Sequence, residues 1–278
     1  MLVNMIDILN QASDNKYAIA QFNINNLEWT RFILEEVNIL GVPAILGVSE
    51  SAIEYMGGYE TVANMVRNLI KYLNVRVPIS IHLDHGSSFD SCKSAIDAGF
   101  TSVMIDYSRY DLETNISETK RVVEYAKEKN ISVEAELGPI NTNESVDISY
   151  VNIDDCIRFC AETNIDFFAP AVGSVHGPYI GEPKLKFELI KEINEKCRIP
   201  LVLHGGSGIP DELIKKSIDC GISKININTE LQQVWAQGVR ENLNINNDVY
   251  DPRKIIKFGE QNIKNMIAKK IELFNNKV

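Results

Sequence analysis

Several features are scarce in this 278-residue sequence, and each scarcity excludes a class of protein. Lysine and arginine number 28 against 38 aspartates and glutamates, and the net charge of −10 argues against a nucleic-acid or anionic-membrane partner. No apolar run approaches the roughly 18 residues of a membrane span, and the N-terminus lacks the basic and apolar segments of a signal peptide. The five cysteines form no CxxC pair, which predicts free thiols in a reducing cytoplasm.

What the sequence does contain is an eightfold alternation of short apolar strands and amphipathic helices. Strands are predicted at 17–23, 43–48, 79–86, 102–106, 132–137, 167–172, 200–203 and 224–229, each followed by a helix. Eight such units predict one closed (β/α)8 TIM barrel, for which about 250 residues is typical. No GxGxxG fingerprint follows the first strand, which disfavours a dinucleotide-binding fold. An additional C-terminal helix is predicted over 253–274, and no linker divides the chain, so residues 1–278 are predicted to form a single domain.

Histidine is also rare, and its placement is informative. Of the four histidines, His85, His176 and His204 each follow an apolar strand and stand beside glycine, whereas His82 lies inside its strand. In a closed barrel the carboxyl ends of the strands meet around one site. Three neutral imidazoles at one point are ligands for a single metal ion with an open fourth position, the arrangement of catalytic zinc. A lone histidine here would more often be structural, but three together favour a metal centre.

Carboxylates stand at the same strand ends. Asp84 precedes His85, and because neighbouring strand residues point to opposite faces, we expect it to act as a general base rather than as a ligand; the alternative is a helix cap. Asp106 and Glu136 end the fourth and fifth strands, where a buried carboxylate pair requires a cation or a hydrogen-bond network. Glu134 shares the phase of Glu136 and is expected to support it from one layer below.

A phosphate site is predicted at the seventh and eighth strands. The loop 205–208 is rich in glycine and opens a helix, so its backbone N–H groups and the Ser207 hydroxyl could hold a phosphate. Asn226, Asn228 and Thr229 lie on the neighbouring eighth strand. Tight turns need glycine anyway, so the loop is weak support alone and moderate support beside this polar cluster.

At these residues the sequence resembles the class II, metal-dependent fructose-bisphosphate aldolases, nearest the forms of low-GC Gram-positive bacteria. The motifs that carry the resemblance are spread over nearly the whole chain: FNINNLE (22–28), ILGVSE (45–50), HLDHGSSF (82–89), GFTSVMID (99–106), EAELG (134–138), GSVHGPY (173–179), LVLHGGSGIP (201–210) and Asp251-Pro252-Arg253. The resemblance implies reversible cleavage of fructose 1,6-bisphosphate into dihydroxyacetone phosphate and glyceraldehyde 3-phosphate, a step of glycolysis and gluconeogenesis.

The resemblance also implies a role for each matched residue. One catalytic Zn²⁺ is bound by His85, His176 and His204, Asp84 handles the C4 hydroxyl proton, and Asp106 and Glu136 match a second cation, divalent or monovalent. The dihydroxyacetone phosphate pocket comprises Gly177, Gly205, Ser207, Asn226, Asn228 and Thr229, with Asn226 reaching the reacting carbons and with Asn23 and Ser49 as further contacts. Arg253 matches an arginine that enters a neighbouring subunit's site, which implies a homodimer or homotetramer.

The sequence departs from the family pattern around the substrate. The segment after EAELG lacks the relatives' glycine hinge, although Glu144 stands at the spacing of their proton-shuttling loop acid. Ile180 replaces a phosphate-binding lysine, for which Lys184 is the nearest substitute. No lysine stands at a strand end in a Schiff-base context except Lys224. Alternatives therefore remain: tagatose-bisphosphate aldolase, which Asn228 fits less well, deoxy-keto-gluconate-phosphate aldolase, or a catalytically impaired phosphosugar-binding paralogue.

Overall fold

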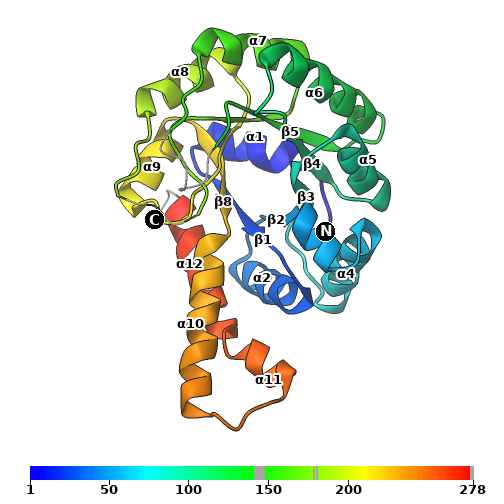
Figure 1. The fold of residues 1–278 in the computed structure, drawn as a ribbon, viewed down its shortest axis with the longest axis vertical. Helices are drawn as coiled ribbons and strands as arrows, with labels where there is room; N and C mark the ends of the chain where they lie inside the picture. Colours follow the sequence, from blue (N-terminus) through cyan, green and yellow to red (C-terminus); the bar gives the residue numbers. More distant parts are fainter. Residues whose placement is uncertain (141–147, 178, 180, 276–278) are drawn as a thin grey trace.

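The predicted strands form a closed parallel barrel in the computed structural model of the protein, which describes residues 1–140, 148–177, 179 and 181–275 (Figure 1). Each strand pairs with the next along the chain, and β1 pairs with β8 to close the ring. The strands are β1 (Ile19–Asn23), β2 (Ala44–Ser49), β3 (Ile79–Gly86), β4 (Ser102–Ile105), β5 (Ser132–Leu137), β6 (Phe167–Pro170), β7 (Leu201–Leu203) and β8 (Ile222–Ile227). The TIM-barrel prediction is confirmed.

Helices alternate with these strands and cover the barrel. They are α1 (Ile6–Asn15), α2 (Leu27–Leu40), α3 (Glu50–Tyr55), α4 (Tyr59–Tyr72), α5 (Phe89–Ala98), α6 (Leu112–Lys127), α7 (Ile153–Thr163), α8 (Phe187–Cys197), α9 (Asp211–Asp219), α10 (Thr229–Ile245), α11 (Pro252–Lys257) and α12 (Glu260–Phe274). Local sequence fixes many of their ends. The Ser88 side chain accepts a hydrogen bond from the Ser91 N–H at the start of α5, and Gly99 ends that helix with φ +94°.

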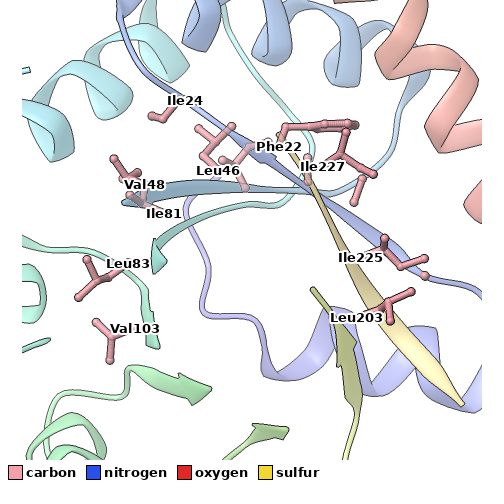
Figure 2. Close-up of a cluster of buried hydrophobic side chains, with 14 of the residues drawn as sticks. Phe22, Ile24, Leu46, Val48, Ile81, Leu83, Val103, Leu203, Ile225 and Ile227 are labelled. Atoms are coloured by element: carbon pink, nitrogen blue, oxygen red, sulfur yellow. The ribbon is translucent and has the colours of Figure 1, made fainter. Parts of the chain in front are cut away.

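The outward faces of the strands pack against the helices and form the main hydrophobic core. Phe22 of β1, Leu46 of β2 and Ile81 of β3 belong to it and are fully buried (Figure 2). Phe32 and Ile33 of α2 cover this face. Since successive strand residues alternate between two faces, the residues between them point into the barrel.

The barrel interior has an apolar end and a polar end. At the amino ends of the strands, one cluster joins α1 to the strands: Met5, Ile8, Leu9, Ala12, Ile19, Ile45, Phe167, Ala169 and Val202. Helix α1, which the sequence pattern did not predict, therefore closes this end. Other interior positions are polar, with Gln21 of β1, His82 of β3, Glu134 of β5 and Lys224 of β8 all fully buried.

The C-terminal helical stretch is present but is divided in two, as α11 and α12. Helix α10 projects from the ring of helices and carries α11 at its far end (Figure 1). The break falls at Gly259, where a Cβ atom would lie only 2.1 Å from the Trp235 ring. The Trp235 Nε1 atom also donates to the carbonyl oxygen of Ile256 at 3.1 Å, satisfying a terminal carbonyl of α11. Trp235 of α10 therefore determines where α11 ends and α12 begins.

Two further boundaries differ from the sequence prediction. Strand β8 ends at Ile227, so Asn228 caps α10 and Thr229 begins it, whereas both were predicted within the strand. The short helix α3 directly follows β2 and was not predicted; the Ser49 side chain accepts from the Ala52 N–H at its start. Among the described residues, no helix is both long and apolar enough to cross a bilayer.

Candidate functional site

A cavity of about 250 Å³ opens at the carboxyl ends of the strands. Eleven residues line it, and every one was predicted from the sequence as a site residue: Asn23, Ser49, Asp84, His85, His176, Gly177, Gly205, Ser207, Asn226, Asn228 and Thr229. They come from the ends of β1, β2, β3 and β8 and from the loops after β6 and β7. A barrel brings these segments together although they are up to 206 positions apart in sequence, the span from Asn23 to Thr229.

Neighbouring residues Asp84 and His85 both face this cavity because β3 is irregular there. The pairing of β3 with β4 shifts register between Leu83 and Gly86, and His85 adopts a left-handed conformation with φ 55°. A Cβ atom at Gly86 would lie 2.6 Å from the Met104 carbonyl oxygen, so only glycine fits. Such a bulge suspends the strict alternation of faces and re-aims a side chain, a device common beside active sites.

The three imidazole rings lie close enough together to bind one metal ion. Their ring centroids lie 4.7 Å apart for His85 and His204, 5.1 Å for His85 and His176, and 5.8 Å for His176 and His204. One nitrogen from each lies within 4.8 Å of the others. Burial, followed by the neighbouring His85 and His204, lowers the pKa of His176 to about 3, so this ring is neutral at physiological pH. A neutral imidazole is the form that binds metal.

Carboxylates orient two of these rings. The Nδ1 atom of His85 lies 2.8 Å from Asp106, and the Nε2 atom of His204 lies 2.9 Å from Glu134. A carboxylate can only accept, so each of these ring nitrogens carries its proton. The remaining nitrogens, His85 Nε2 and His204 Nδ1, are 3.0 Å apart. Two nitrogen lone pairs at that separation need either a proton or a metal ion between them.

The local field favours that cation. Burial opposes charge on His85, but its hydrogen bond to Asp106 and the nearby Asp84 and Glu136 outweigh burial and raise its pKa to about 10. The same carboxylates would attract a metal ion. Three imidazole nitrogens with carboxylate partners behind them are the donor set of a zinc site, so the residues present fit that metal.

A second group of potential ligands shares His85 and adds Asp106 and Glu136. Asp106 accepts from the Ser108 N–H at 3.1 Å and the Ser108 hydroxyl at 2.7 Å. Glu136 accepts from the Ile140 N–H at 3.1 Å through Oε1, whereas its buried Oε2 has no hydrogen-bond partner among the described residues. Burial and then Asp106 raise the pKa of Glu136 to about 8. A buried, half-satisfied carboxylate beside another is costly without a cation or a proton.

Asp84 is held as an anion at the floor of the cavity. It accepts from the Asn23 Nδ2 atom at 2.8 Å and from the Asn226 Nδ2 atom at 3.4 Å. Burial opposes its charge, but the adjacent His85 and His204 outweigh that effect and hold its pKa well below its usual range. An ionised carboxylate next to the imidazoles can accept a proton from a bound hydroxyl group.

Two glycine-containing loops form the opposite wall. A Cβ atom at Gly205, where φ is +65°, would lie 2.1 Å from the Val175 carbonyl oxygen, so the loops after β6 and β7 touch. Tyr179 links them, since its hydroxyl accepts from the Val175 N–H at 3.1 Å and donates to the Gly205 carbonyl at 3.0 Å. The Ser207 oxygen accepts from the Asn228 N–H at 3.3 Å. This leaves its hydroxyl proton to donate, beside the amino end of α10.

Two predicted substrate residues, Lys184 and Arg253, are not brought into this cavity. Lys184 is exposed and does not line it. Arg253 lies on α11, where its side chain is 86% exposed and pairs with Asp251 at 2.8 Å. Glu144 lies outside the described residues, as does Ile180. The roles of all four therefore remain predictions.

Sequence reasoning missed the polar layer beneath the cavity. Gln21 donates to the Asn23 Oδ1 atom at 3.3 Å, and Lys224 donates to the Asn226 Oδ1 atom at 2.9 Å. Each of these residues lies two positions before the amide it contacts. The period of two along β1 and β8 was the available signal, because residues two apart share a face.

A closed parallel barrel with imidazoles and an ionised carboxylate gathered at its strand ends is the architecture of a metal-dependent barrel enzyme. The family follows from sequence: the model described as "Fructose-bisphosphate aldolase class-II" matches residues 3–277. The chain belongs to the class II fructose-bisphosphate aldolase family, which is metal-dependent.

Individual relatives agree with this assignment. Proteins named fructose-bisphosphate aldolase from Geobacillus stearothermophilus and Staphylococcus aureus are 52% and 51% identical to the chain, covering 99% and 98% of it and 97% of each relative. The crystal structure of the YdjI aldolase from Escherichia coli K12 superimposes with a TM-score of 0.87 at 33% identity, covering 99% of this chain and 98% of that one. The expected nearness to low-GC Gram-positive enzymes is confirmed.

Proposed function

We propose that this chain is an aldolase that reversibly cleaves fructose 1,6-bisphosphate into dihydroxyacetone phosphate and glyceraldehyde 3-phosphate. Family membership supports the reaction class, and the relatives from Geobacillus and Staphylococcus support the substrate. One observation carries the proposal: the Asp84 carboxylate lines the same cavity as His85 and His176, with which His204 clusters. A retro-aldol cleavage needs that pairing, because one group must accept the hydroxyl proton while the carbonyl is polarised.

His85, His176 and His204 would bind one Zn²⁺ as the catalytic metal. Bound there, zinc supplies a Lewis acid that polarises the substrate carbonyl. Asp106 and Glu134 hold two of these rings in the required tautomers, as the 2.8 Å and 2.9 Å contacts indicate. Asp106 and Glu136 would hold a second cation, divalent or monovalent, which would also satisfy the unpartnered Glu136 Oε2 atom.

Asp84 would take the proton of the C4 hydroxyl as the C3–C4 bond breaks. The two amides that donate to it, Asn23 and Asn226, hold its carboxylate plane and keep it ionised. Asn226 would also contact the reacting carbons, since its amide lines the cavity. Glu144 would exchange the proton of the dihydroxyacetone phosphate carbon; this role comes from the family pattern alone.

The dihydroxyacetone phosphate arm would lie along the glycine loops. Backbone N–H groups at Gly177 and Gly205, the hydroxyls of Ser207 and Thr229, and the Asn228 amide supply donors without a fixed charge. Ser49, on the opposite side of the cavity at the end of β2, would contact the rest of the sugar.

The distal phosphate would require a second copy of the chain. Arg253 lies on α11, which the projecting helix α10 carries, and its side chain is exposed (Figure 1). In a homodimer or homotetramer its guanidinium would enter a neighbouring subunit's site. Lys184, close in sequence to the missing family lysine, would add charge at the rim. A cytoplasmic location accords with five free cysteines.

Turnover of three purified substrates, with metal content measured in parallel, tests this function. We expect fructose 1,6-bisphosphate to be cleaved with a kcat/KM at least tenfold above tagatose 1,6-bisphosphate and the deoxy-keto-gluconate phosphate, at about one zinc per chain. A higher kcat/KM for either alternative substrate would change the substrate assigned to this chain but not its family. Binding of a phosphosugar without cleavage of any would identify an impaired paralogue.

A further inference from the structure

Lys224 lies directly beneath the cavity, although it does not line it. It stands on β8, two residues before Asn226, and is fully buried. Its Nζ atom lies 2.8 Å from Glu134 Oε2 and 2.9 Å from Asn226 Oδ1. One buried cation thus contacts both the amide that reaches Asp84 and the carboxylate that holds a metal-binding histidine.

The contact with Asn226 decides which way its amide points. A lysine ammonium has three donors and no acceptor, so only the Oδ1 atom of Asn226 can face it. The Nδ2 atom must then face Asp84, where it lies 3.4 Å from Oδ1 of the carboxylate. With the amide turned over, an oxygen would face the Asp84 anion and an N–H group would face the ammonium, and both contacts would be repulsive.

Asn23, the other amide that donates to Asp84, lacks such an ionic constraint. Its Oδ1 atom accepts from Gln21 Nε2 at 3.3 Å, and in the described part of the chain the Oε1 atom of Gln21 has no hydrogen-bond partner. Gly47 makes room for this side chain, since a Cβ atom there would lie 2.4 Å from Nε2. A neutral amide can itself turn over, whereas an ammonium cannot become an acceptor. Asn226 is therefore the more firmly oriented of the two.

The contact with Glu134 acts on the metal ligands. Glu134 and Lys224 form a fully buried ion pair, and the second oxygen of Glu134 lies 2.9 Å from His204 Nε2. An ionised Glu134 keeps the proton on Nε2 and leaves Nδ1 of His204 to face His85. Lys224 therefore holds the carboxylate that in turn holds the His204 ring.

We propose that Lys224 is a positioning residue that fixes the Asn226 amide through one contact and the His204 tautomer through the other. The inference rests on the proposed aldolase function for its catalytic half. Burial against Glu134 and Asn226 leaves the lysine no access to substrate, so it does not act as a Schiff-base nucleophile.

Four variants separate the two contacts: Lys224→Met, the double variant Lys224→Met/Glu134→Gln, Asn226→Ala, and Asn226→Ala combined with Lys224→Met. Zinc affinity by competition with a chelator, kcat, KM and Tm are measured for each. We expect Lys224→Met to weaken zinc binding about 10- to 100-fold, as loss of a ligand's supporting partner does. We expect kcat to fall by a similar factor of about 10 to 100, with a smaller change in KM.

The double variant Lys224→Met/Glu134→Gln separates the effect of Lys224 on Asn226 from its effect on Glu134. Glutamine is neutral, so it leaves no unpaired buried charge, and its carbonyl oxygen can still accept from His204. Zinc affinity and Tm should therefore recover toward the wild-type values while kcat stays low, because Asn226 is still unanchored. Recovery of kcat together with Tm would show that Lys224 only neutralises Glu134 and would overturn the proposal. If Lys224→Met does not fold, the double variant still decides the point.

The effect of Lys224→Met in the Asn226→Ala background is a second test of the proposal. There Lys224→Met should reduce kcat by less than about threefold, because the amide it positions is gone. A full, additive loss would contradict positioning through Asn226. Trapping of dihydroxyacetone phosphate on Lys224 by borohydride would make it a nucleophile and also overturn the proposal. If the wild-type chain cleaves no aldol substrate, the proposed function fails, whereas zinc affinity still tests the His204 contact.

Discussion

The two ends of the barrel interior are built on the same strands but hold opposite kinds of side chain. On β2, Ile45 packs against α1 at the closed end, whereas Ser49 lines the cavity at the open end. Val202 of β7 belongs to the apolar cluster, and His204, in the residue directly after β7, belongs to the histidine cluster. The closed end gains stability from buried apolar surface. At the open end, burial of polar groups costs stability, because those groups must be satisfied by one another or by a ligand.

This difference shows that residues for stability and residues for chemistry occupy different positions along one strand. They are not assigned to different strands or helices. His204 lies two positions after Val202, about 7 Å further along an extended chain. Substitutions at the open end should therefore alter turnover with little loss of fold, and substitutions at the closed end should do the reverse. Four experiments test that separation, from the largest expected effect on activity to the smallest.

Removal of the metal should abolish aldol cleavage while the barrel stays folded. Dialysis against a chelator empties the three-histidine site, and cleavage should fall below detection because carbonyl polarisation is lost. Adding Zn²⁺ back should restore it, and borohydride with substrate should trap no covalent adduct. Far-ultraviolet circular dichroism before and after dialysis is the control. Substantial activity in a metal-free preparation would falsify the mechanism.

Asp84→Asn should lower kcat about 10²- to 10⁴-fold, the usual contribution of a general acid–base group. The amide cannot accept the C4 proton, although it fills the same space. Zinc content should remain near that of the wild type, since Asp84 is not among the clustered ligands. Asp97→Asn, on the exposed face of α5, is a matched control that should leave kcat unchanged. An Asp84 variant within a few-fold of wild type would limit this carboxylate to a structural role.

Ser207→Ala should weaken binding of the phosphate arm about tenfold, the value of one hydrogen bond to a charged group. KM should rise with less change in kcat, because the contact is the same in ground and transition states. Ser217→Ala is the matched control, since that hydroxyl donates to Leu213 within α9 at 2.7 Å. Equal KM values for the two variants would place the phosphate elsewhere in the cavity.

Ile45→Ala should leave kcat/KM within about twofold while destabilising the fold by about 2–5 kcal/mol, the cost of such a truncation in a packed core. Ile45 is fully buried against α1 and the neighbouring strands at the closed end. Urea unfolding measures the change. Ile39→Ala, at a side chain 75% exposed, should cost less than about 0.5 kcal/mol. A large loss of activity in a folded Ile45 variant would show that the two ends are coupled.

Much of the site could be predicted because its residues follow strand ends in the sequence. His85, His176 and His204 needed only the rule that the carboxyl ends of barrel strands converge. Asp84 and His85 were both predicted as residues of this site, but the bulge that turns both toward the cavity was not, because it arises from the β3–β4 pairing. Helix α1 was missed because its apolar residues are covered by strands that are distant in sequence.

By itself, the sequence determined which residues form the candidate site and at which end of the barrel they stand, since periodicity and strand order are local properties. Only the tertiary structure decided how those residues face one another. The direction of the Asn226 amide depends on Lys224, and the tautomer of His204 depends on Glu134 of β5, 70 positions away. Hydrogen-bond direction is a property of a pair of groups in space, so a pattern read along one chain does not contain it.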